Sequence, residues 1–170
     1  MGKVDANSRQ DLLKLLQLAG GLIAAIDGLW FLAVEDQFGY SEAIRLDTKV
    51  WEKYAHIVVK RMKDKIGLSK TGIEGIKELI GFDPLLLNLD YEIPELSEKT
   101  MLLRVNKCPV LEAMERAGRK TFVCESTTGL YFRNIAKEID PQVVVSPLRL
   151  PPRVSPKDVC CEWLFTTEIQ

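Results

Sequence analysis

The sequence GFDPLLLNLDYEI, residues 81–93, divides the chain into two parts with different patterns of apolar residues. Upstream of it, apolar residues recur every three or four positions, which is the period of an α-helix. The pair Asp83-Pro84 ends that pattern, because a proline disfavours helical backbone in the residue before it. Downstream, short apolar runs are separated by turn residues, which is typical of strands.

The upstream part predicts three helices, or four if the chain breaks at Gly20-Gly21. The alternative for these glycines is that they let another segment pack closely. The first helix begins after Ser8, a suitable N-cap, and continues to residue 38 before Gly39. Ser41 is predicted to cap the second helix, which ends at Gly67. The third helix is expected over residues 71–80.

The downstream part predicts a sheet with two inserted helices. The fold class is therefore α+β, with an N-terminal helical layer packed on a mainly antiparallel sheet of about four strands. We expect a single domain over residues 1–170, with a helical part at about 8–81 and a sheet-containing part at about 84–168. The predicted strands are 85–93, 100–105, 142–148 and 158–167, with a short extended segment at 120–124, and the inserted helices are 109–117 and 126–139.

Charge and hydropathy limit the expected partners. The net charge of −1 gives no general attraction to nucleic acid. The polar segment 1–10 does not read as a secretory signal, so a cytoplasmic location is expected. The apolar stretch 12–34 carries Asp27, which is costly inside a bilayer, so we expect a buried helix and no membrane partner. Surplus apolar area on this helix would suit a homodimer.

Four cysteines in the C-terminal half are the main chemical lead. Cys108 is followed by Pro109, which is favoured at the first turn of a helix, so its sulfur is expected at a helix N-terminus. Backbone N–H groups there favour the thiolate, the form needed by a nucleophile or a metal ligand. Cys124 also precedes a predicted helix start. The alternative is that both are small residues packed at junctions.

Cys160 and Cys161 are adjacent on a predicted strand, so their side chains are expected on opposite faces. Only one of them would then join Cys108 and Cys124. A metal site of Cys108, Cys124 and Cys161 would suit zinc or iron, although the spacing matches no zinc finger. The alternative is again packing.

Four further candidates come from the helical part. His56, the single histidine, would be the base that activates a cysteine, or else a surface or packing residue. Asp27 lies in the apolar run 22–31 and must be hydrogen-bonded, protonated or facing a cavity. Trp30 and Trp51 are predicted to line the same pocket as Asp27, with ordinary core packing as the alternative.

These residues carry a resemblance to a known group of proteins. The segment 27–35, Cys108-Pro109, Cys124 and the strand 161–165 are similar to a family of small, mostly uncharacterised bacterial and archaeal cytosolic proteins. That family is related to the L-2-amino-thiazoline-4-carboxylic acid hydrolases. A fainter resemblance, from Cys124 onward, is to the 4-vinyl reductase domain, which implies ligand binding.

Two functions follow as expectations. The first is a hydrolase of a small amide- or thiazoline-like molecule, with Cys108 and Cys124 in the site and His56 or Asp27 as the base. The second is a non-catalytic domain that binds a small molecule or a metal. A third possibility is a structural protein whose cysteines only pack. Loss of turnover in Cys108→Ser would separate the first from the second.

Overall fold

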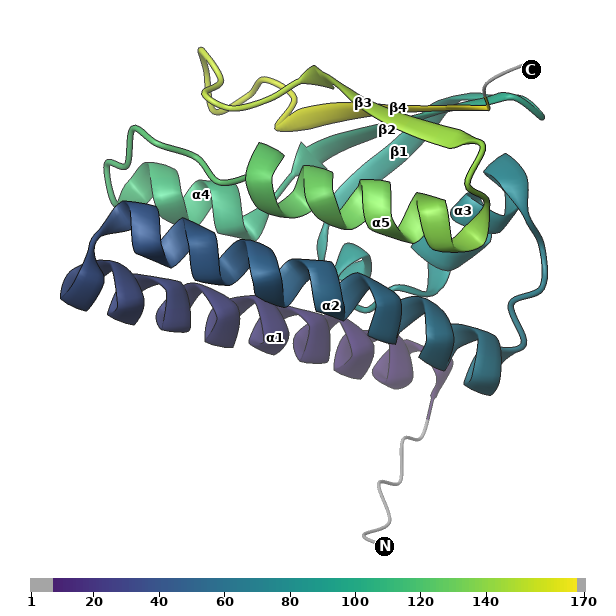
Figure 1. Ribbon diagram of the computed structural model, residues 1–170, viewed down its shortest axis with the longest axis horizontal. Coiled ribbons are helices and arrows are strands. Elements are labelled where there is room, and N and C mark those ends of the chain that lie inside the picture. Colours follow the sequence, from purple (N-terminus) through teal and green to yellow (C-terminus); the bar gives the residue numbers. More distant parts are fainter. Residues whose placement is uncertain (1–7, 168–170) are drawn as a thin grey trace, which may run out of the picture.

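The computed structural model describes residues 8–167 and consists of helices covering one face of a four-stranded sheet (Figure 1). The segment 1–7 lies outside the described residues, so most of the polar segment used above to exclude a signal is not described. The elements are α1 (Arg9–Phe38), α2 (Tyr40–Ile66), α3 (Gly72–Phe82), the 3₁₀ turn η1 (Leu86–Asn88), β1 (Asp90–Leu96), β2 (Thr100–Lys107), α4 (Pro109–Arg116), the π turn η2 (Glu125–Gly129), α5 (Leu130–Ile139), β3 (Val143–Arg149) and β4 (Cys161–Thr167).

The two long helices form an antiparallel pair joined at a single glycine. The side chain of Ser8 caps α1 by accepting a hydrogen bond from the Asp11 N–H. Gly39 separates α1 from α2 with a φ of +85°, a conformation that L side chains rarely adopt. The expectation that Ser41 caps the second helix was wrong, because α2 already begins at Tyr40 and Gly39 is its N-cap.

Close approach of the backbone explains Gly20. Helix α1 continues unbroken through Gly20-Gly21, so the second of the two alternatives holds. A Cβ at Gly20 would lie 1.9 Å from the carbonyl oxygen of Pro84, at the start of the segment that leads into η1. Only a residue without a side chain fits there. Gly20 therefore fixes α1 against the segment that connects α3 to the sheet.

The sheet has the order β1-β2-β4-β3 and every neighbouring pair is antiparallel. The predicted α+β class is confirmed. Three strand boundaries differ from the expectation. Residues 86–88 form η1 rather than strand, the segment 120–124 pairs with no strand, and β4 begins at Cys161. The run of leucines before β1 is a turn because Asp83 caps it, as described below.

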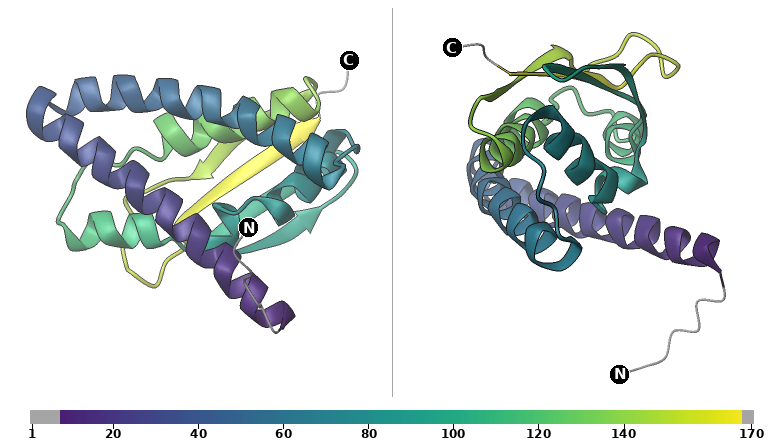
Figure 2. Two further views of the ribbon diagram at one scale, coloured as in Figure 1. Left: turned by 90° about the horizontal axis from the view of Figure 1, so that it is seen from below. Right: turned by 90° about the vertical axis from the view of Figure 1, so that its right-hand side faces the viewer.

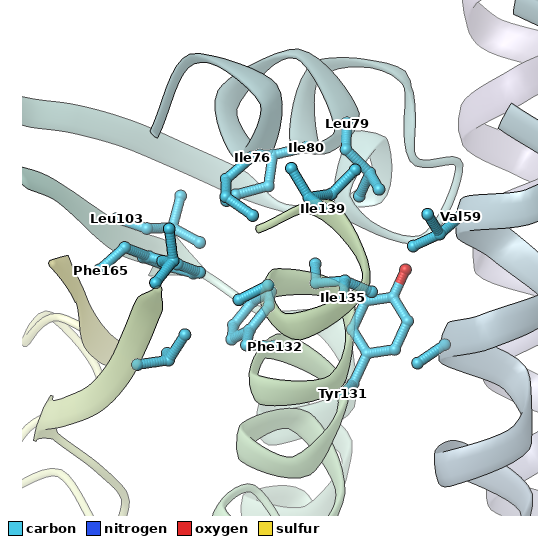
Figure 3. Close-up of a cluster of buried hydrophobic side chains, with 14 of the residues drawn as sticks. Val59, Ile76, Leu79, Ile80, Leu103, Tyr131, Phe132, Ile135, Ile139 and Phe165 are labelled. Carbon is cyan, nitrogen blue, oxygen red and sulfur yellow. The ribbon is translucent and has the colours of Figure 1, made fainter. Parts of the chain in front are cut away.

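Helices α3, α4 and α5 lie between the sheet and the long helices, which Figure 2 shows from two further sides. Helix α5 contacts both α2 and β3, so it links the outer helices to the sheet. Figure 3 shows how it does so: Phe132 points toward Phe165 and Leu103 of the sheet, whereas Tyr131 points toward Val59 of α2. All five of these residues are buried in one continuous core.

Asp83 holds the junction between the helical and sheet-containing parts. Its side chain is fully buried and accepts hydrogen bonds from the Tyr131 hydroxyl and, at 2.9 Å, from the Leu85 N–H. Its carbonyl oxygen accepts hydrogen bonds from the N–H groups of Leu86 and Leu87, each at 3.0 Å. Asp83 therefore forms the turn that the sequence pattern alone suggested as strand.

Helix α1 is not the buried helix that its apolar sequence suggested. In its most apolar 18-residue window, 11% of the residues are buried. Gly20 and Phe31 are buried against the rest of the chain, whereas leucines on the opposite side are exposed. Helix α1 carries apolar residues on nearly all sides, but only one side of it packs against other described residues.

Replacement of Gly20 tests the close contact between α1 and Pro84. Gly20→Ala should lower the free energy of unfolding by about 2–3 kcal/mol, because the added methyl group overlaps a backbone carbonyl. Gly81→Ala is the matched control, since no atom lies within 4 Å of its Cβ, and it should raise stability by about 0.5–1 kcal/mol. Urea unfolding measures both. Equal effects of the two substitutions would contradict the packing described here.

Candidate functional site

A cleft of about 340 Å³ lies between the two long helices. Among the described residues, Asp27 is the one charged side chain that lines it. The structure brings Asp27, Trp30 and Trp51 together, as the sequence predicted for a pocket. The complete lining is Ile23, Ala24, Ile26, Asp27, Trp30, Val50, Trp51, Tyr54 and Leu85.

A second carboxyl group stands behind Asp27. Asp47 of α2 is 2% exposed and does not line the cleft. Its Oδ1 atom and the Trp51 Nε1 atom are buried without a hydrogen-bond partner at normal distance within residues 8–167. They are nevertheless close enough that the Trp51 side chain lowers the pKa of both Asp27 and Asp47. The Asp47 Oδ1 atom and the Trp51 N–H group therefore retain unused hydrogen-bonding capacity.

The two carboxyl groups titrate as a pair. Burial raises the pKa of Asp47 to about 7, and the nearby charge of Asp27 contributes to that shift. Burial also raises the pKa of Asp27. Two carboxylates in one apolar environment repel each other, so the pair is expected to take up one proton as the pH falls through about 7.

Aromatic rings connect the cleft to the core. The Trp51 ring lies 5.7 Å from the Tyr54 ring and 5.6 Å from the Tyr131 ring, both edge to face. The Tyr54 and Tyr131 rings stack with centroids 5.9 Å apart. Burial and the charge of Asp83 raise the pKa of Tyr54 to about 12, so its hydroxyl stays protonated. The wall of the cleft is thus held by the same Tyr131 that bonds Asp83.

The four cysteines lie at one end of the sheet. Their surroundings favour the protonated thiol over the thiolate. The Cys108 side chain caps α4 and accepts a hydrogen bond from the Leu111 N–H at 3.5 Å, which confirms its predicted place. Burial outweighs this contact and raises the pKa of Cys108. Burial also raises the pKa of Cys124 and of Cys161 to about 12, and the charges of neighbouring thiols add to both shifts. The expected thiolate at Cys108 is therefore not favoured.

Both members of the Cys160-Cys161 pair lie near the other two cysteines. Cys160 precedes β4, so the strict alternation of a strand does not apply to it. Its thiol donates a hydrogen bond to the Asn106 carbonyl oxygen at 3.3 Å. Each of the two influences the pKa of Cys124. The expectation that only one of the pair joins Cys108 and Cys124 stays a prediction.

No metal site is assembled in the part of the chain that the structure describes. Between residues 8 and 167, no group of three or more His, Cys, Asp or Glu side chains is arranged to hold a metal ion. Cys108, Cys124 and Cys161, predicted as zinc or iron ligands, therefore have no support as a metal centre here.

His56 lies away from the cysteines. Its Nδ1 atom is 3.0 Å from Glu138 Oε1, and its side chain is mostly exposed. Glu138 is in the last turn of α5, whereas Cys124 precedes the π turn that leads into α5. Helical rise places these two points roughly 20 Å apart. The structure thus gives His56 a surface carboxylate as its hydrogen-bond partner and does not bring it to a thiol.

The family comparison covers almost the whole described chain. A model for a family of unknown function, DUF6125, matches residues 5–167. The chain belongs to this family. The match includes both long helices of the cleft and all four cysteines. The comparisons with curated proteins and with solved structures gave no match. None of these comparisons supports the expected relation to thiazoline hydrolases or to the 4-vinyl reductase domain, so that relation stays a prediction.

Sequence reasoning missed Asp47 and Asp83. The signal for Asp47 was present, because it falls on the apolar row of α2 formed by Ala43, Trp51 and Ala55, at helical spacing. A carboxylate on a buried stripe requires a partner or a raised pKa. Asp83 gave a weaker signal, since Asp-Pro also reads as a simple helix stop.

The reactivity of the thiols tests the reading of the cysteine cluster. In the folded protein at pH 7.5, all four cysteines should react slowly with an aromatic disulfide reagent, because burial raises the pKa of each thiol. In urea, all four should react at the rate of a free thiol. A single fast thiol in the folded protein would restore the nucleophile hypothesis for that residue.

Proposed function

We propose that this protein binds a small organic cation with an apolar body in the cleft between α1 and α2. The observation that carries the proposal is one carboxyl group, Asp27, in an otherwise uncharged lining, with the buried carboxyl group of Asp47 behind it. A volume of about 340 Å³ suits a small ligand. The function is that of a binding domain, the second of the two expectations from sequence.

Charge favours a cation over an anion. An anionic ligand would be repelled by Asp27 and Asp47, which already compete for one proton. A ligand ammonium group can take the place of that proton and leave both groups ionised. In the cleft it would contact Asp27 directly, whereas Asp47, which does not line the cleft, would act through its charge.

The aromatic lining favours the same class of ligand. Trp30, Trp51 and Tyr54 contribute their rings to the cleft. Such rings attract ammonium groups through their negative faces and also pack against apolar carbon. Ile23 and Val50 extend this apolar surface toward the opening, where they are partly exposed.

A cysteine hydrolase is the weaker proposal. It needs a thiolate and a base within hydrogen-bonding reach. Burial raises the pKa of Cys108, and His56 is bonded to Glu138. No observation on the cysteine cluster identifies a substrate, so hydrolysis of an amide or thiazoline stays a prediction from the resemblance alone.

Calorimetric titration with matched probes tests the cation proposal. At pH 8, 2-phenylethylamine should bind, whereas the neutral 2-phenylethanol and the anionic 3-phenylpropionate should not. Asp27→Asn should weaken amine binding at least tenfold, because it removes the charge in the lining. Asp36→Asn, an exposed site on the same helix, should leave binding unchanged. Equal binding of the amine and the alcohol would contradict the proposal.

The pH dependence of the same titration tests the role of Asp47. Amine affinity should fall below about pH 7, by up to tenfold per pH unit, because the proton taken up by the pair must then be displaced. Asp47→Asn removes the group whose pKa is about 7, so the fall in affinity around pH 7 should disappear. An affinity that stays constant in the unsubstituted protein would overturn the shared-proton account.

A further inference from the structure

The exposed side of α1 carries a regular apolar seam. Its members follow each other at alternating intervals of three and four residues, which is the pattern of a coiled-coil helix. They are all exposed: Leu22 at 61% and Leu29 at 64% are the most prominent leucines. The complete seam is Leu15, Leu18, Leu22, Ala25, Leu29 and Leu32.

This seam faces away from the rest of the chain. Successive residues of an α-helix are rotated by about 100°, so Leu22 lies about 200° from Gly20, which touches Pro84. Leu29 lies a similar angle from Phe31, which is buried. No interaction within the described residues therefore requires leucines at these positions.

Gly28 is a second, independent observation at the edge of the seam, about 100° around the helix from Leu29. It lies in the middle of α1, where glycine costs about 1 kcal/mol relative to alanine. Nothing within residues 8–167 lies within 4 Å of its Cβ position, so packing inside the chain does not require it. A glycine beside a leucine seam lets a second helix approach closely.

We propose that the occupant of this seam is α1 of a second copy of the chain. Helix α1 has 30 residues, so it is about 45 Å long and about 10 Å wide. Half of such a cylinder is roughly 700 Å², close to the roughly 800 Å² per partner of a stable dimer. A two-fold pair brings the same seam to both sides of the interface, which requires no other protein.

A lipid bilayer is the competing occupant. Within residues 8–167, α1 is the one helix long and apolar enough to cross a membrane. However, Gly20 fixes one part of it to Pro84, and Glu35 near its other end forms a bidentate ion pair with Arg119 at 2.7 Å. Crossing would break both contacts. Helices that lie on a membrane surface are rich in basic residues. Helix α1 has two, Arg9 and Lys14, against four acidic residues, which are Asp11, Asp27, Glu35 and Asp36.

Light scattering during size-exclusion chromatography, without detergent, tests the proposal. The protein should have a mass of about 38 kDa, twice the 19.2 kDa of one chain. The double variant Leu22→Glu, Leu29→Glu should be a folded monomer, since neither residue lines the cleft or contacts the core. The control Ile66→Glu, Leu148→Glu places the same charges on exposed apolar residues of α2 and β3 and should remain a dimer.

Gly28→Leu gives a test that does not add charge. No atom of the described chain lies within 4 Å of the Cβ position, so this substitution should leave folding intact but weaken the dimer at least tenfold. A monomeric unsubstituted protein would overturn the proposal. If that monomer floated with vesicles of phosphatidylcholine and phosphatidylserine, the seam would belong to a membrane surface instead. A dimer unaffected by Leu22→Glu, Leu29→Glu and by Gly28→Leu would place the interface elsewhere.

Discussion

The hydrogen bond between the Tyr131 hydroxyl and the buried Asp83 carboxylate supports most of this architecture. Asp83 forms the turn after α3, and the next residue, Pro84, provides the carbonyl against which Gly20 of α1 packs. Tyr131 comes from α5, which joins the outer helices to the sheet. A fully buried carboxyl group is costly unless it is hydrogen-bonded, so the fold depends on keeping this donor in place.

The same interaction shapes the cleft. Leu85, whose N–H bonds to Asp83, lines it from one side. Tyr131 stacks on Tyr54, and both rings lie beside Trp51. The cleft walls are therefore held by contacts that also stabilise the core, whereas Ile23 of α1 and Val50 of α2 in the lining are exposed. Such an arrangement combines a fixed floor with an accessible entrance, as small-molecule sites usually do.

Much of the fold was predictable from sequence because periodicity reports burial along one element at a time. It identified the long helices, the antiparallel α+β class and the position of Cys108 at a helix start. It suggested that Asp27, Trp30 and Trp51 line one pocket, because a carboxylate in an apolar run must be hydrogen-bonded, protonated or facing a cavity. It failed for Asp83, whose partner Tyr131 is 48 residues away, and for the thiols, whose pKa depends on burial that spacing does not report. Contacts between distant segments decide both.

The most direct test of this account is the free energy of unfolding of Tyr131→Phe in urea at pH 5 and pH 8. Burial already raises the pKa of Asp83, and without the hydroxyl donor that pKa rises further. A carboxyl group whose pKa is raised in the folded state lowers the free energy of unfolding of the protein as the pH increases. The account therefore predicts that Tyr131→Phe lowers this free energy by about 2–3 kcal/mol, and by more at pH 8 than at pH 5. Tyr91→Phe, a half-buried control, should change stability by less than about 0.5 kcal/mol. An equally small, pH-independent effect of Tyr131→Phe would contradict the central role of this hydrogen bond.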